Sequence, residues 1–162
     1  MMSGVQEMKG LLFEELELIV ETTSNLIRKI SPEDWSYQPR ENMNTLQQLV
    51  QHLVSVPKID LLIIQEGTEQ AVRQLEAEIK DEQNVEKLIA WMNDGFAELK
   101  VYMEGLSDDD FLHKRGIPFY LEHGTIQAKW LIEVVTHAQH HRAQLFNYLK
   151  QLGYEVNMFD LY

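Results

Sequence analysis

The chain has 162 residues, 44% of them hydrophobic, which suffices for one hydrophobic core and predicts a single domain over residues 1–162. Its 14 Lys and Arg against 26 Asp and Glu give a formal net charge of −12, which argues against nucleic acid and anionic membranes as partners, because both would repel the protein. Cysteine is absent, so disulfides, thiolate metal ligands and cysteine nucleophiles are excluded, and any metal site must use nitrogen and oxygen.

The N-terminal segment has no basic region followed by an apolar run, and no segment approaches the about 20 apolar residues that cross a bilayer. A cytoplasmic location is therefore expected.

Apolar residues at steps of three and four predict a first amphipathic helix from about residue 5 to about residue 30. Ser31 and Pro32 favour a short turn after it, and residues 37–44, which lack periodicity, predict an ordered loop.

A second helix is expected over residues 45–65, capped at its start by Asn44 or Thr45. Pro57 lies inside it and should kink or break it, because proline lacks the backbone N–H that the helix needs. A bend just after His52 would help to shape a cavity. The polar residues 66–83 that follow predict a partly helical, mostly solvated segment.

The second half of the chain predicts two more long helices. The third runs from Asn84, its cap, to Gly105, and the fourth runs from a cap at Thr125 to about Gly153. Residues 107–124 between them form a long connection, with a short extended or hairpin piece around residues 117–121. The aromatic tail, residues 154–162, is expected to pack back on the helices. Four long amphipathic helices with a long crossover predict an all-α fold, a four-helix bundle with a long connection between helices 3 and 4.

Three histidines interrupt apolar stripes of these helices. His137 and His141 are four residues apart, so their imidazoles share one face of the last helix and can bind one metal ion. A catalytic metal needs a third ligand, and His52 lies in the apolar stripe of the second helix. Taken alone, His52 is better explained as a core histidine that is hydrogen-bonded to its neighbours than as a metal ligand. Together, the three residues predict a three-histidine metal site, since a metal would satisfy all three buried rings.

Other polar residues near this site have simpler explanations. His140 lies about 100° around the helix from His141 and is expected at the surface. The same is expected of His113 and His123 in the long connection, with a supplementary ligand as the alternative. For Arg142 an ion pair with a carboxylate is favoured over substrate binding. For Glu133 an exposed position is favoured over a hydrogen bond to a metal ligand.

The sequence resembles the DinB-like superfamily, which also contains the YfiT-type proteins and the bacillithiol and mycothiol S-transferases. The resemblance covers nearly the whole chain and is most specific in two motifs. These are Thr45-Leu46-Gln47-Gln48-Leu49-Val50-Gln51-His52 and His137-x-x-x-His141-Arg142-Ala143-Gln144, supported by Leu149-Lys150-Gln151-Leu152-Gly153 and by Asp160.

This resemblance implies a bundle of up-down-down-up order, frequent dimerisation, and a divalent metal on three histidines that match His52, His137 and His141. It also implies thiol-dependent transferase chemistry for some relatives, while many others have no known activity. Residues 37–44 depart from the usual pattern, because they lack the tryptophan-serine step often found before the second helix. The departure bears on substrate specificity and leaves the metal site untouched.

Two hypotheses follow for function. As an enzyme, the protein would bind Zn²⁺ or Ni²⁺, with Mn or Fe as further options, and would use a small-molecule thiol to attack an electrophile that enters beside the long connection. A hydrolase that uses metal-bound water is closely related to this idea. As a non-enzyme, the protein would be a metal-bound, dimerising stress-response module. An open coordination position with a cleft favours an enzyme, whereas a fourth protein ligand favours a structural role.

Di-iron chemistry fits poorly, because paired Glu-x-x-His segments are missing. A homodimer is expected for a separate reason. Leu62, Ile63 and Ile64 form an apolar run that no single buried helix face can absorb, so part of it should meet a partner.

Overall fold

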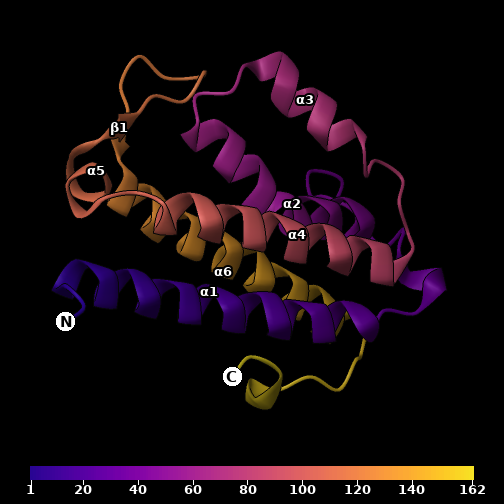
Figure 1. Ribbon diagram of the computed structural model, residues 1–162. Helices are drawn as coiled ribbons and strands as arrows, with labels where there is room; N and C mark the ends of the chain where they lie inside the picture. The colour runs from indigo at the N-terminus through magenta and orange to yellow at the C-terminus, as the bar shows by residue number, and fades with distance from the viewer.

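The computed structural model describes residues 1–162, and its main feature is four long helices that pack lengthwise against one another (Figure 1). These are α1 (Gly4–Arg28), α2 (Leu46–Ile64), α4 (Val85–Glu104) and α6 (Gln127–Gln151), and the shorter elements are η1 (Pro32–Asp34), α3 (Glu69–Ala77), α5 (Asp108–His113), β1 (Arg115–Gly116), β2 (Thr125–Ile126) and η2 (Met158–Asp160). In Figure 1, α1 and α6 run from left to right, whereas α2 and α4 run from right to left. The mostly helical fold is confirmed, and the two-stranded sheet is the departure from the all-α prediction.

The core consists of two clusters of buried apolar side chains, one toward each end of the long helices. The first combines the C-terminal halves of α1 and α6 with the N-terminal halves of α2 and α4, and the second combines the opposite halves. On α2 the change from one cluster to the other falls between Val54 and Val56, and on α6 it falls between Ala138 and Leu145. His52, His137 and His141 therefore lie close to the level at which the two clusters meet.

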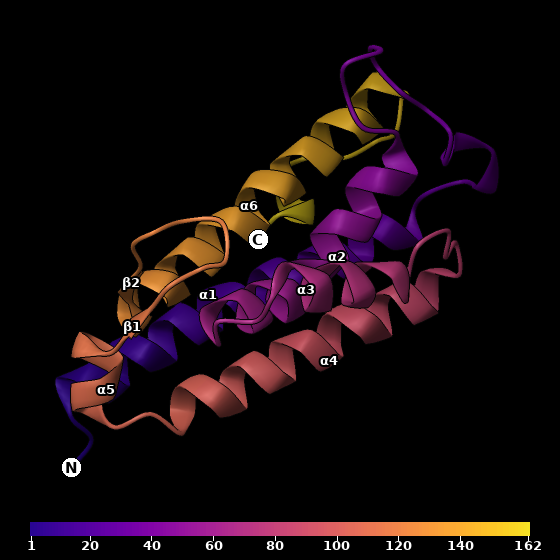
Figure 2. The same ribbon diagram turned by 90° about the horizontal axis from the view of Figure 1, so that it is seen from above.

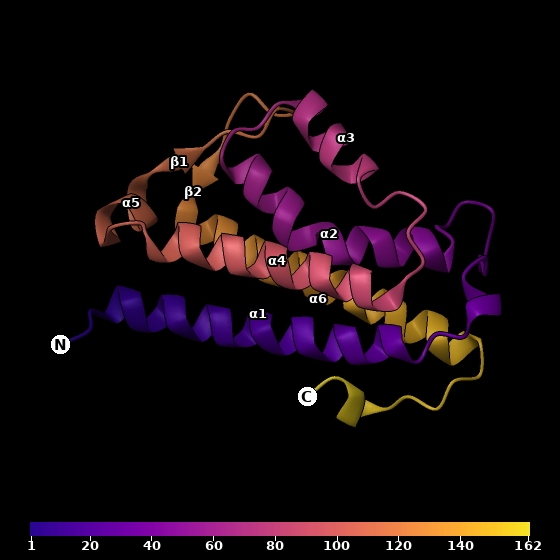
Figure 3. The same ribbon diagram turned by 45° about the vertical axis from the view of Figure 1, so that its right-hand side comes forward.

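The start and the bend of α2 follow from its sequence. Thr45 Oγ1 accepts a hydrogen bond from the Gln48 amide at 3.2 Å, and Gln48 Oε1 accepts one from the Thr45 amide at 2.9 Å, so the two residues form a capping box. Pro57 does not break the helix, but Figures 1 and 3 show α2 changing direction in its middle, as expected for an interior proline. Beside this bend α2 lies very close to α4, because a Cβ on Gly95 would approach Lys58 Cβ to 2.8 Å.

The polar segment after α2 forms α3, as the prediction of a partly helical segment requires. Thr68 caps it by accepting a hydrogen bond from the Ala71 amide at 3.1 Å. Val72 and, just beyond the helix, Ile79 are buried, while most of the remaining side chains face solvent. Viewed from above, α3 lies over α2 (Figure 2).

The long connection has more structure than the sequence predicted. Ser107 caps α5 by accepting a hydrogen bond from the Asp110 amide at 3.1 Å, and three acidic residues then fill the first turn. Strands β1 and β2 pair antiparallel, and residues 117–121, where an extended or hairpin piece was expected, lie in the loop between them with a turn at residues 119–120. Thr125 is therefore not the cap of the last helix. It lies in β2, paired with Gly116, and α6 begins two residues later without a side-chain cap.

The C-terminal tail packs back on the helices, as predicted, and Arg142 is one of the residues that hold it. The expected ion pair of Arg142 is wrong. Its guanidinium is buried and donates to Thr22 Oγ1 at 2.9 Å and to the Leu161 carbonyl at 3.0 Å, with no carboxylate partner. Tyr154, near the start of the tail, donates from its hydroxyl to Asp34 Oδ2 at 2.6 Å.

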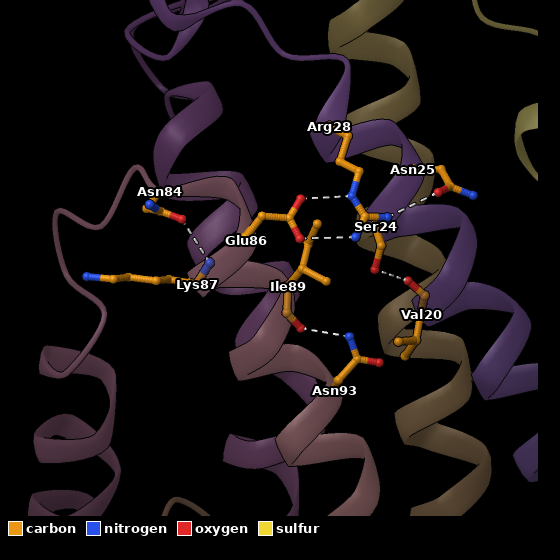
Figure 4. Close-up of polar contacts among 9 residues, drawn as sticks. All are labelled: Val20, Ser24, Asn25, Arg28, Asn84, Glu86, Lys87, Ile89 and Asn93. Atoms are coloured by element: carbon orange, nitrogen blue, oxygen red, sulfur yellow. Dashed lines mark hydrogen bonds and ion pairs between the residues drawn. The ribbon is translucent and has the colours of Figure 1, made fainter.

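On the side of the molecule away from α3, residues of α1 and α4 line a hollow of about 340 Å³, and Figure 4 shows the polar contacts beside it. Arg28 spans it at one end, donating from Nε and Nη2 to the two carboxylate oxygens of Glu86 at 3.0 and 3.2 Å. The Ser24 hydroxyl and the Asn93 amide each donate to a carbonyl one turn earlier in their own helix.

The apolar run of α2 is absorbed within the protomer. Leu61 and Ile64 are buried, and Leu62 and Ile63 are half-buried. This run therefore does not require a partner subunit, and the homodimer stays a prediction that rests on other grounds. No helix combines the length and the apolar character needed to cross a membrane.

Candidate metal centre

The three histidines singled out in the sequence converge although 85 residues separate His52 from His137. Helix α2 supplies His52, and α6 supplies His137 and His141 from successive turns. The Nε2 atoms of His52 and His137 are 3.2 Å apart, and the ring centroids of His52 and His141 are 4.4 Å apart. One nitrogen from each ring lies within 4.8 Å of the other two, which is the spacing expected of ligands around one metal ion.

Hydrogen bonds orient two of these rings from behind. Asp60 Oδ2 is 2.8 Å from His137 Nδ1, and Gln144 Oε1 is 2.8 Å from His141 Nδ1. Since carboxylate and amide oxygens only accept, each Nδ1 carries the proton, and each Nε2 keeps its lone pair for a ligand position. A histidine that donates to an oxygen through one nitrogen and binds through the other is the usual arrangement of metal sites, so these residues fit a divalent cation.

The electrostatics of the three rings differ. Burial, followed by repulsion from His141 and His137, lowers the pKa of His52 to about 4, although part of the residue remains exposed. Burial also lowers the pKa of His141, whereas the hydrogen bond that His137 donates to Asp60 raises the pKa of His137. Burial raises the pKa of Asp60, and its bond with His137 opposes that change. Two of the three imidazoles are therefore held in the neutral form that binds metal.

The sequence analysis missed Asp60 and the role of Gln144. A signal for Asp60 exists, because it lies eight residues after His52, on the same face of the helix, in an otherwise apolar run. Gln144 belongs to the motif of the last helix and lies three residues after His141, within reach on the next turn.

The remaining histidines and Glu133 lie outside the cluster. His140 is exposed and receives a hydrogen bond from Gln144 Nε2 at 3.2 Å. His113 pairs with Asp109 at 3.0 Å at the surface, and His123 is also exposed. Glu133 is partly exposed and pairs with Lys129, in line with the simpler explanation that the sequence favoured.

A cavity of about 410 Å³ adjoins the histidines between α2 and α3. This size is within the range of small-molecule sites. None of its lining residues comes from the long connection, so the predicted entry of a substrate beside that connection does not coincide with the cavity. The lining comprises Gln48, Gln51, His52, Ser55, Val56, Ile59, Asp60, Arg73, Glu76, Ala77, Ile79, Lys80 and His137.

Comparison with known proteins identifies the family. A family model described as the DinB family matches residues 2–162. The chain belongs to the DinB family. A search of curated proteins finds no match to this sequence.

Solved structures of other DinB proteins share the fold. A protein from Exiguobacterium sibiricum assigned to the DinB family superposes with a TM-score of 0.78 at 25% identity, over 97% of each chain. A DinB-like protein from Bacillus subtilis gives a TM-score of 0.63 at 18% identity, over 90% of this chain and 94% of the other. A DinB-like protein from Bacillus cereus gives 0.68 at 16% identity, over 90% and 93%.

Proposed function

We propose that this DinB protein binds a divalent metal ion through His52, His137 and His141 and transfers a small-molecule thiol to an electrophile. The observation that carries the proposal is a cluster of three imidazoles, with no fourth histidine, aspartate or glutamate in the group, beside a cavity of about 410 Å³. Three protein ligands leave a coordination position for a reactant, as in catalytic sites, whereas structural sites are closed by a fourth ligand.

The protein supplies no sulfur nucleophile, because it has no cysteine, so the thiol must be a second substrate. When bound, the metal would supply the positive charge that favours the thiolate form near neutral pH. In the overall reaction, the thiol sulfur bonds to a carbon of the electrophile, the bond from that carbon to its leaving group breaks, and the thiol proton passes to solvent. His52 contributes an imidazole that stays neutral far below pH 7, since its pKa is about 4.

Asp60 and Gln144 are positioning residues in this proposal. Each accepts a hydrogen bond from the outer nitrogen of a ring and fixes the direction in which its inner nitrogen points. The wall formed by α3 over α2 encloses the space beside the rings, where a thiol or an electrophile can be bound close to the reacting atoms.

The proposal also includes the architecture implied by the family resemblance: one domain, built as a four-helix bundle of up-down-down-up order, that forms a homodimer. The opposite directions of the α1/α6 and α2/α4 pairs support this order (Figure 1). Zn²⁺ and Ni²⁺ are the preferred cations, because imidazole nitrogen suits both.

The test is a conjugation assay on the purified full chain. Elemental analysis first identifies the metal, and the loaded protein is then mixed with an aryl chloride and, in turn, cysteine, glutathione, coenzyme A and bacillithiol. We expect conjugation above the uncatalysed rate with at least one thiol, and its loss after removal of the metal by chelation. Metal binding without conjugation of any thiol would contradict the transferase and favour the structural module.

A further inference from the structure

The cavity beside the histidines lies between two helices that are held in place to different degrees. Helix α2 forms its floor, where His52 and Ser55 lie, and α3 with the turn after it forms its outer wall, where Arg73, Ala77 and Lys80 lie. Figures 1 and 3 show α3 outside the four long helices. A ligand of the cavity lies between α2 and α3, so the attachment of α3 decides how the cavity is filled and emptied.

Two apolar side chains hold this outer wall against the rest of the protein. Val72 is 5% exposed and Ile79, just beyond α3, is 7% exposed, whereas most other side chains of residues 67–80 face solvent. Ile79 belongs to the first core cluster, and Val72 belongs to neither cluster. The wall is therefore held by far less buried apolar surface than any of the four long helices.

No polar side chain ties the wall to the rest of the protein. The hydrogen bonds and the ion pair formed by side chains of residues 67–80 all stay within α3 and its N-cap. The residues on either side are tied down, by contrast. Glu66 Oε1 accepts a hydrogen bond from the Ile117 amide at 3.1 Å, and Gln83 Nε2 donates one to Gln47 Oε1 at 2.8 Å. Residues 67–80 thus form a stretch with fixed ends and a loosely held middle.

Both ends of this stretch have an unfavourable backbone conformation. Glu66 has a φ of 61° and Asp81 has a φ of 68°, and no other residue except a glycine has a positive φ. A left-handed backbone is costly for a residue with a side chain and persists only where its surroundings enforce it. Rotation at these two positions releases that strain, so Glu66 and Asp81 are suited to act as hinges.

We infer that residues 67–80 form a lid, which swings away from α2 as one unit about Glu66 and Asp81 and so opens the cavity beside His52 and His137. Opening withdraws the two apolar side chains from their contacts and leaves the four long helices in place. Low local stability of this kind is typical of segments that cover binding sites. The inference goes beyond the proposed function, because the lid governs access to the cavity whatever ligand or reaction the cavity serves.

The experiment measures opening through the labelling of a single introduced thiol by iodoacetamide in the full chain, which has no cysteine of its own. Val72→Cys places the thiol under the lid. Val20→Cys is the matched control, because Val20 is 4% exposed but lies on α1 in the first core cluster. We expect Val72→Cys to be labelled at least about a hundredfold faster, since local opening costs less than global unfolding. Its rate should hardly rise in dilute urea, because opening exposes little surface.

A second substitution tests whether the stretch moves as one unit. Ile79→Ala, added to Val72→Cys, removes the other apolar anchor and should raise the labelling rate at least about 30-fold, because loss of a buried isoleucine weakens the closed state. Ile89→Ala is the matched control. Ile89 is 5% exposed and lies on α4, so its loss should leave the labelling rate of Val72→Cys within about twofold. The assay needs no metal, so its outcome is independent of the proposed function.

Labelling of Val72→Cys that is as slow as that of Val20→Cys, and rises as steeply with urea, would mean that α3 leaves α2 only when the whole protein unfolds. A rate that Ile79→Ala leaves unchanged, or that Ile89→Ala raises equally, would show that residues 67–80 do not move as a unit. Either result would overturn the inference. Hydrogen exchange makes the same comparison on the unsubstituted chain, where amides in the middle of α3 should exchange at least about a hundredfold faster than those in the middle of α1. Equal protection of the two helices would contradict the lid.

Discussion

Two hollows of similar size lie on opposite sides of the molecule, and they differ in what their polar groups already bind. In the hollow of about 340 Å³ between α1 and α4, the Arg28 guanidinium pairs with Glu86, and Ser24 and Asn93 donate to carbonyls of their own helices (Figure 4). In the cavity of about 410 Å³ between α2 and α3, Lys80 has no partner, and His52 faces only the imidazoles of His137 and His141.

This difference shows that volume and polarity do not by themselves make a binding site. A polar group whose hydrogen bonds are already satisfied within the protein gains little from a ligand. An imidazole that faces two others, by contrast, gains a partner when a cation binds. The hollow between α1 and α4 also contains Glu17 and Glu21, whose carboxylates have no partner within the protein, but only the cavity beside α3 contains imidazoles that gain a partner when a cation binds.

The largest effect should come from removing a metal ligand. We expect His137→Ala to lower the affinity for Zn²⁺ or Ni²⁺ at least about a hundredfold, because loss of outer hydrogen-bond partners alone costs about 10–100-fold. His141→Ala should lower metal content at least about tenfold. Metal titrations followed by elemental analysis measure both. His140→Ala is the control and should leave metal content unchanged, and a loss equal to that of His141→Ala would contradict the assignment of ligands.

The next effect concerns the packing of the helix that supplies the cavity floor. Gly95→Ala should destabilise the protein by about 1–3 kcal/mol, because its Cβ would lie 2.8 Å from the backbone nitrogen of Lys58 and α2 or α4 would have to move. Urea unfolding measures the change. Gly10→Ala is the control, since a Cβ there meets nothing within 4 Å and the helix interior favours alanine. Equal stability of the two variants would disprove the close approach.

Asp60→Asn tests whether the hydrogen bond between His137 and Asp60 contributes to metal affinity. At pH 8 we expect a loss of about tenfold in metal affinity, because an amide accepts more weakly than a carboxylate. The hydrogen bond raises the pKa of His137, so in the wild type a proton competes with the metal as the pH falls through that raised value. In the Asp60→Asn variant the proton begins to compete at a lower pH. The metal affinities of the wild type and the variant should therefore approach each other near pH 6.

Metal titrations between pH 5 and pH 8 measure this convergence. Glu133→Gln is the matched control, because Glu133 lies on α6 one turn before His137 but pairs with Lys129. A parallel shift of the Asp60→Asn curve, without convergence at low pH, would show that Asp60 does not act through the protonation of His137.

The smallest effect is expected in the hollow between α1 and α4. Arg28→Ala removes an exposed ion pair with Glu86 and should change the midpoint of urea unfolding only slightly, since such pairs are screened by solvent. Metal affinity and conjugation rate should not change. A variant with reduced metal affinity would mean that the two sides of the molecule are coupled, which the comparison of the two hollows does not predict.

The three histidines could be predicted from the sequence because each interrupts an apolar stripe. The expectation that all three rings are buried is wrong, since His52 is exposed and His137 and His141 are half-buried. Asp60 gives a similar signal in α2, but Pro57 lies between it and His52. A proline leaves open whether the helix continues or breaks, and therefore whether the two residues share a face. The structure shows that α2 bends and continues, which is what brings Asp60 behind His137.

Other features were hidden because they depend on contacts distant in the chain. The local preference of Thr125 for a helix cap is overridden by its strand pairing with Gly116. The position of α3 over α2 depends on few buried side chains, among them Val72 and Ile79, and such a weak pattern does not specify which helix is covered. The partner of Arg142 is a carbonyl of the tail, which becomes available only once the chain has folded back.

Arg142 also links the last residues of the chain to the histidine cluster on the other side of α6. It follows His141 directly, so one helical turn carries a proposed metal ligand and a residue that holds the tail. Cleavage before Leu161 would leave a buried cation with Thr22 as its remaining acceptor, and any shift of α6 that relieves this would also move the His141 ring. Trimming by a carboxypeptidase, or a fusion appended at Tyr162, should therefore change the metal affinity even where the protein stays folded. Metal titration of a chain ending at Asp160 tests this. A metal affinity equal to that of the full chain would show that the contact between Arg142 and the tail does not influence His141.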